Sequence, residues 1–129
     1  MEPPASLHRS EGCEIELGPV NLRANVGPGL AQQIQACYRA VVNECLNRRC
    51  TRVLIVGVSN GDAFNHLALR DALRSMSVAG LPPDFRLAVV AGTPDLIAVF
   101  DAAVVEAGRC SIDARRLLTV AEAEGWLAV

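Results

Sequence analysis

Apolar residues recur along the chain with two spacings, and the two spacings alternate. Continuous apolar runs at residues 53–58 and 86–91 are typical of strands buried on both faces of a sheet. Apolar residues in steps of three and four over residues 30–49, 63–76 and 94–107 indicate amphipathic helices. The pattern therefore predicts alternating strands and helices.

The N-terminal part of the chain reads differently. Residues 14–17 and 20–26 predict two strands joined by a tight turn at Gly18-Pro19. Residues 1–11 predict a loose tail. We therefore expect a single domain over residues 12–129.

Short signals mark where the later elements begin. Thr93 followed by Pro94 predicts the start of the third helix, with the threonine hydroxyl as its cap. Residues 112–118 predict a weaker strand. Thr119 and Glu122 predict a capping box for a last helix. Of the helical apolar positions, Leu30 and Leu67 are among those expected to face the core.

The predicted order is β-β-α-β-α-β-α-β-α. Strands and helices in this order build an α/β fold: an open, mostly parallel sheet with an N-terminal antiparallel strand pair and about four flanking helices. Ligands of such sheets bind beyond the carboxyl ends of the strands. Here those ends precede residues 59–62, 92–95 and 118–119.

Composition limits the function classes. The chain has 129 residues, 51% of them hydrophobic, and a formal net charge of −2. That charge argues against general nucleic-acid binding, and no apolar run approaches the length of a membrane span. Residues 1–12 do not resemble a secretory signal, so we expect a cytoplasmic protein.

The cysteines agree with that expectation. There are five, an odd number, and no two form a Cys-x-x-Cys pair, which predicts free thiols in a reducing compartment and no structural metal site. Cys37 and Cys45 are expected to be small core residues on one helix. Cys50 lies between Arg49 and Arg52, and positive neighbours favour a reactive thiolate.

Two C-terminal stretches resemble the STAS domain family, the fold of the bacterial anti-sigma-factor antagonists. Residues 85–90 (FRLAVV), after a Gly-Leu-Pro loop, resemble a strand of the uncharacterised free-standing bacterial branch of that family. Residues 117–127, with Glu-Ala and then Trp-Leu, resemble its closing pattern. The resemblance covers roughly residues 13–129. It implies a non-catalytic regulatory or protein-interaction module with no cofactor, an unknown protein partner, and homodimerisation as a further option.

The family's phosphorylation motif is not kept. Phosphorylated antagonists carry Asp-Ser-Ser/Thr-Gly, with the acceptor hydroxyl just before the glycine. Alignment on Gly61 places Val58 at the aspartate and Asn60 at the acceptor position, while Ser59 lies one place early. The resemblance therefore does not imply a phosphoserine switch.

The same residues also match a hydrolase motif. Gly57-Val58-Ser59-Asn60-Gly61 fits G-x-S-x-G between a strand and a helix, the context of a serine nucleophile. No histidine follows His66, which lies only seven residues after the serine and is poorly placed to act as its base. A small serine hydrolase is therefore a less favoured alternative. Asp62 and His66 share a helix face, and a surface hydrogen-bonded pair explains them better than a catalytic dyad.

A further alternative is a carrier or sensor of a small anionic or apolar molecule. The starts of the second and third helices meet at one sheet edge, where backbone amides attract anions. Ser59, Asn60, Gly61, Asp62, Thr93 and Asp95 are the candidate ligand- or partner-binding residues. Helix capping accounts equally well for Asp62 and Thr93, and turn chemistry for Asn60-Gly61.

Overall fold

Six strands form one sheet in chain order. The computed structural model describes residues 5–58 and 63–129, with side chains for all of these except 63–65. The strands are β1 (Ala5–Ser10), β2 (Cys13–Leu17), β3 (Leu22–Val26), β4 (Arg52–Gly57), β5 (Arg86–Ala91) and β6 (Asp113–Leu117). β1, β2 and β3 pair antiparallel, and β3 to β6 pair parallel. The α/β class and the mostly parallel sheet are as predicted.

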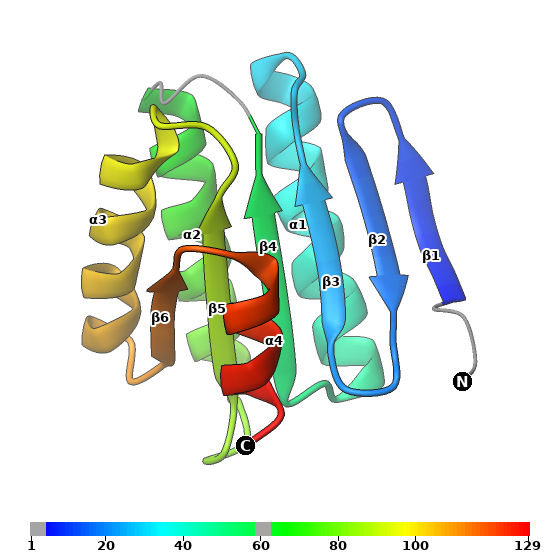
Figure 1. Ribbon diagram of the computed structural model, residues 1–129, viewed down its shortest axis with the longest axis vertical. Coiled ribbons are helices and arrows are strands. Elements are labelled where there is room, and N and C mark those ends of the chain that lie inside the picture. Colours follow the sequence, from blue (N-terminus) through cyan, green and yellow to red (C-terminus); the bar gives the residue numbers. More distant parts are fainter. Residues whose placement is uncertain (1–4, 59–62) are drawn as a thin grey trace.

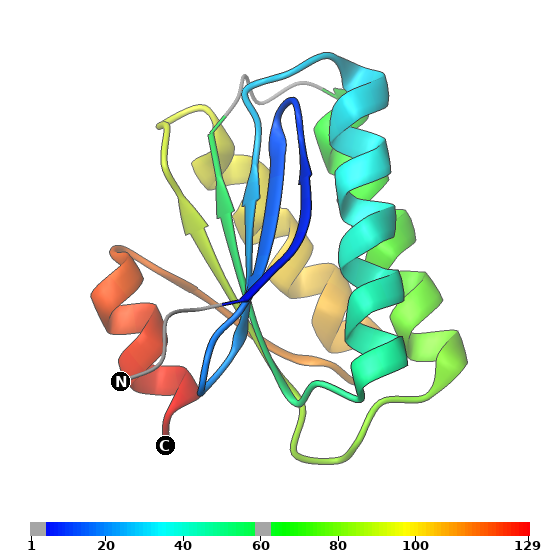
Figure 2. The same cartoon turned by 90° about the vertical axis from the view of Figure 1, so that its right-hand side faces the viewer.

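Three helices cover one face of the sheet and one covers part of the other. The helices are α1 (Ala31–Arg48), α2 (Ala63–Ala79), α3 (Leu96–Arg109) and α4 (Val120–Leu127). The parallel strands advance in one direction, so right-handed crossovers place α1, α2 and α3 on the same face. Figures 1 and 2 show α4 on the opposite face, where it contacts β4, β5 and β6.

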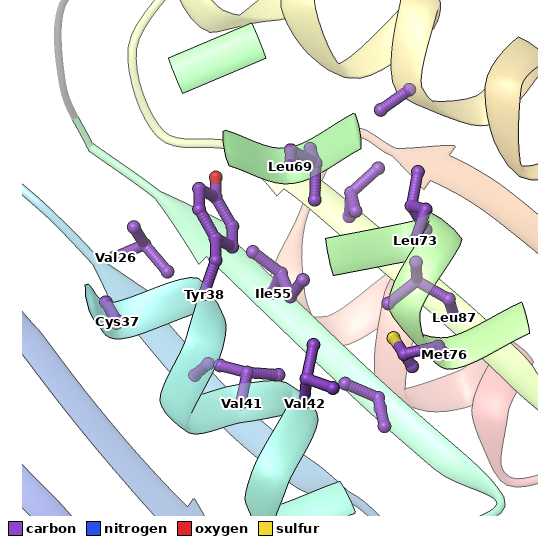
Figure 3. Packing of buried hydrophobic residues seen from close by; sticks show 14 of the residues in the cluster. Val26, Cys37, Tyr38, Val41, Val42, Ile55, Leu69, Leu73, Met76 and Leu87 are labelled. Carbon is purple, nitrogen blue, oxygen red and sulfur yellow. The ribbon is translucent and has the colours of Figure 1, made fainter. Parts of the chain in front are cut away.

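The main core lies between the sheet and α1, α2 and α3 (Figure 3). In β3 the inward residues Leu22, Ala24 and Val26 are buried, whereas Arg23 and Asn25 point to the uncovered face. In β4 and β5 both faces are covered. This double coverage explains why those two strands read as continuous apolar runs.

A smaller core lies beneath α4. Leu54, Ala88 and Val90 of the sheet pack there against Ala123 and Leu127. Arginines secure the end of the helix: Arg52 Nε donates to the Leu127 carbonyl at 2.8 Å, and Arg86 donates to the Trp126 carbonyl at 2.9 Å. The guanidinium carbons of Arg86 and Arg115 lie over the Trp126 ring, at 5.3 and 5.0 Å from its centroid. Trp126 thus fixes α4 to the sheet.

Two elements differ from the sequence prediction. Residues 5–10 form the edge strand β1 where a tail to residue 11 was expected. The prediction that Thr93 caps the third helix is wrong, because α3 begins at Leu96 and its N-cap is Asp95. Residues 93–95 form a turn in which Leu96 N donates to Thr93 O at 3.1 Å. At α4 half of the predicted capping box is present: Thr119 Oγ1 accepts from Glu122 N at 3.1 Å, while the Glu122 carboxylate accepts from Leu118 N at 3.3 Å and not from Thr119 N.

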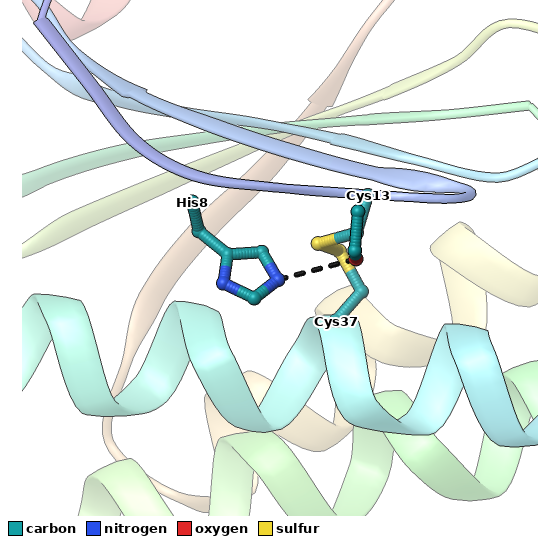
Figure 4. The surroundings of a disulfide bond; sticks show 4 residues. His8, Cys13 and Cys37 are labelled. Atoms are coloured by element: carbon teal, nitrogen blue, oxygen red, sulfur yellow. Dashed lines mark hydrogen bonds between the residues drawn. A yellow bond between two sulfur atoms is a disulfide. The ribbon is translucent and has the colours of Figure 1, made fainter.

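A disulfide joins Cys13 of β2 to Cys37 of α1, with their Cα atoms 5.4 Å apart. This corrects the prediction that all cysteines are free thiols. Cys37 is in the core as expected, and so is the free Cys45. Figure 4 shows the bond between the β1–β2 hairpin and α1, with His8 beside it. The disulfide therefore anchors the N-terminal hairpin to the helical layer.

Candidate functional site

The carboxyl ends of β3, β4 and β5 meet at one edge, as the topology predicted. Val58 N donates to Val26 O at 2.8 Å, and Gly92 N donates to Gly57 O at 2.7 Å. These hydrogen bonds extend the pairing of β3 with β4, and of β4 with β5, by one residue beyond the strand ends. Thr93 and Asp95 follow directly in the β5–α3 turn. Ser59, Asn60, Gly61 and Asp62 lie outside the described residues, so their sequence-based roles stay predictions.

Gly57 and Gly92 let the backbones at this edge approach closely. A Cβ on Gly57 would lie 2.6 Å from Phe100 Cζ and 2.8 Å from Leu96 Cδ1. A Cβ on Gly92 would lie 2.7 Å from the Gly57 carbonyl oxygen. Gly57 is thus needed for the packing of α3, which explains the first glycine of the G-x-S-x-G match without hydrolase chemistry.

Several exposed apolar side chains lie toward the carboxyl ends of the parallel strands. The structure has nine large exposed hydrophobic residues among those it describes. Five of them follow the end of a parallel strand or lie in the first turns of the next helix: Leu30, Val58, Leu67, Ile97 and Leu118. We call these five the carboxyl-edge apolar residues. Leu30 and Leu67 were predicted to face the core, and the structure shows that they do not.

The uncovered half of the second sheet face is charged. It presents Glu14 and Glu16 of β2 and Arg23 of β3. Arg9 of β1 lies beside them, with its Nη2 atom 3.6 Å from Glu14 Oε2. The hydrogen bond between the two glutamates lowers the pKa of Glu14 and raises that of Glu16. This mixed charge explains how strands β1 to β3 keep one face in solvent. It does not assemble a metal site: among the described residues no group of three acidic, histidine or cysteine side chains can hold an ion.

The structure describes two further candidate residues, His66 and Cys50. His66 is half-buried on α2, and its proposed partners Ser59 and Asp62 lie outside the described residues. Burial raises the pKa of the Cys50 thiol despite its positive neighbours. The hypothesis of an activated Cys50 thiolate is therefore not supported.

Comparisons with known proteins do not assign this chain to a family. The chain matches no family model, no curated protein and no solved structure. Within the residues that the structure describes, no helix is long and apolar enough to cross a membrane.

Proposed function

We propose that this chain is a non-catalytic regulatory module that binds a protein partner through the carboxyl edge of its sheet, in the manner of an anti-sigma-factor antagonist domain. The observation that carries the proposal is that five of the nine large exposed hydrophobic residues in the described part of the chain lie toward the carboxyl ends of the parallel strands. Leu30 is 70% exposed and Leu118 is 74% exposed. Grouped apolar side chains at a polar rim mark protein-interaction sites more often than single ones do.

The composition of this edge supports a protein partner over a small anion. Thr93 and Asp95 supply polar groups beside the apolar residues, and the Asp95 carboxylate would repel an anion. In this proposal Ser59 is the accessible hydroxyl of the partner surface, and Asn60 and Gly61 shape the loop. The resemblance to the STAS family is part of the same proposal.

The test compares matched apolar substitutions. Leu30→Ser and Leu118→Ser remove apolar side chains from the edge. Val78→Ser serves as the control, because it removes an apolar side chain that is 89% exposed but lies at the far end of α2. Each tagged variant is isolated gently from the source cells, and native mass spectrometry records what remains bound.

The parent chain and the Val78→Ser control are expected to retain one bound protein of defined mass. The retained amount of that protein should fall at least about tenfold with the edge variants. Equal retention by all variants, or loss with Val78→Ser alone, would show that the edge is not the binding surface. If the partner protein is still retained after substitution of both Ser59 and Asn60, these two residues do not belong to the binding surface. A small-molecule mass in place of a protein would favour the carrier or sensor instead.

The compartment belongs to the same proposal. A regulatory domain of this kind is expected in the cytoplasm, whereas disulfides persist mainly in oxidising compartments. Alkylation of cell extracts at the moment of lysis, followed by mass spectrometry of the Cys13 and Cys37 peptides, distinguishes the two. Alkylated cysteines would support a cytoplasmic protein, and a cross-linked peptide would contradict it.

A further inference from the structure

A groove runs between α1 and α2 on the side of the helical layer that faces away from the sheet. Its volume is about 350 Å³. Val42 and Ala68 form its buried apolar floor, and the small side chains Ala72 and Ser75 leave it open on the α2 side. The two helices lie side by side and run in the same direction, because both return from parallel strands (Figure 2).

Opposite charges stand on the two walls of this groove. Arg39 is the middle one of three polar groove residues on α1, between Gln35 and Asn43. Asp71 lies midway between the groove residues Ala68 and Ser75 on α2. Both side chains are exposed, and within the described part of the chain neither belongs to an ion pair. Each charge therefore lies near the middle of its wall of the groove and has no ion-pair partner among the described residues.

Before Glu44, the outer surface of α1 is otherwise almost free of charge; Glu44 and Arg48 in its last turns pair with each other. From Ala31 to Asn43 its only charged residue is Arg39, and the exposed positions carry glutamine, asparagine and alanine. A solvent-facing helix usually carries several charges, whereas the centre of a protein interface is depleted of them. This surface has the composition of an interface centre with one specific charge.

We propose that α1 and α2 form the interface of a homodimer whose two-fold axis runs along the groove. A two-fold axis parallel to the helices places α1 of each copy over α2 of the other. Arg39 of each copy then faces Asp71 of its partner, so one contact is made twice. The charge pattern of the groove is thus complementary to itself, and a second copy of this chain is the occupant that satisfies both charges.

The test is a charge swap. Arg39→Asp and Asp71→Arg are made singly and together, and the dimer dissociation constant is measured by sedimentation equilibrium. Each single variant places like charges opposite each other, so we expect at least a tenfold weaker dimer. The double variant restores opposite charges and is expected to regain most of the parent affinity. Glu124→Arg on α4, on the other side of the sheet, is the control and should leave the dimer unchanged.

Far-UV circular dichroism of each variant separates loss of fold from loss of dimer. A parent chain that is monomeric up to its solubility limit overturns the proposal. So does a dimer that the single variants do not weaken, or one that the double variant fails to restore. A failure here leaves the partner surface at the carboxyl edge untouched, because the two proposals involve different residues.

Discussion

Reduction of the Cys13–Cys37 bond is expected to cost a large part of the stability of this domain. The two cysteines are 24 positions apart. Closing a loop of that size restricts the unfolded chain, and the loop-entropy relation gives about 3.4 kcal/mol at 25 °C. Single domains are stable by only about 5–15 kcal/mol in total. Both side chains are buried, at 4% and 1% exposure, so the folded state is expected to keep the bond shielded from reductant.

Urea unfolding of the same protein with and without a phosphine reductant measures this cost. The reduced protein should unfold at lower urea, with a steeper dependence because its unfolded chain exposes more surface. The variant Cys13→Ala/Cys37→Ala is the control, and reductant should not change its transition. Equal transitions for the oxidised and reduced parent would refute the reasoning. So would five free thiols in the denatured, unreduced protein, where the structure expects three.

Three further predictions follow from local contacts. Gly57→Ala should destabilise the fold by about 1–3 kcal/mol in urea unfolding, because its Cβ would meet Phe100, whereas an unchanged midpoint would contradict the packing. Burial raises the pKa of Tyr38, so phenolate absorbance should appear only as the protein unfolds. Tyr38 ionisation should leave the free energy of unfolding unchanged below pH about 10, the pKa of tyrosine in the unfolded chain, and should lower it above that pH. Burial also raises the pKa of Cys45 to about 12, so alkylation at pH about 8 should be far slower there than at a model thiol, and slowed less at Cys50.

The elements that could be predicted from sequence are those whose burial repeats at a regular spacing. β4 and β5 are covered on both faces and read as continuous apolar runs. β1 could not be found in this way. Its residues are mostly exposed, and Leu7 is its only hydrophobic residue packed on the core, so no alternation marks it as a strand. The disulfide was equally hidden, because it joins a strand to a helix 24 positions away and an odd cysteine count suggests no pairing.

The sheet edge that carries the candidate residues could be predicted from the sequence, but which apolar side chains are exposed there could not. Strand order alone places the carboxyl ends of β3, β4 and β5 at one edge. Leu30 fits the helical spacing of Ile34, yet it precedes the first residue of α1 and stays in solvent. Leu67 likewise fits the inward pattern of α2 and is exposed. Periodicity identifies a face of a helix, whereas exposure depends on how far the neighbouring elements reach along that face.

The two proposed surfaces are compatible, and their geometry gives them a joint consequence. A two-fold axis parallel to α1 and α2 leaves the direction of the strands unchanged, so both carboxyl edges of the dimer point the same way. A partner that carries two binding sites could then engage both edges at once. Linked binding of this kind can exceed the affinity of one site by about 10²–10⁴. The charge-swap variants therefore offer a second readout: Arg39→Asp should weaken the binding of a bivalent partner but not that of a monovalent fragment, although Arg39 lies outside the carboxyl edge.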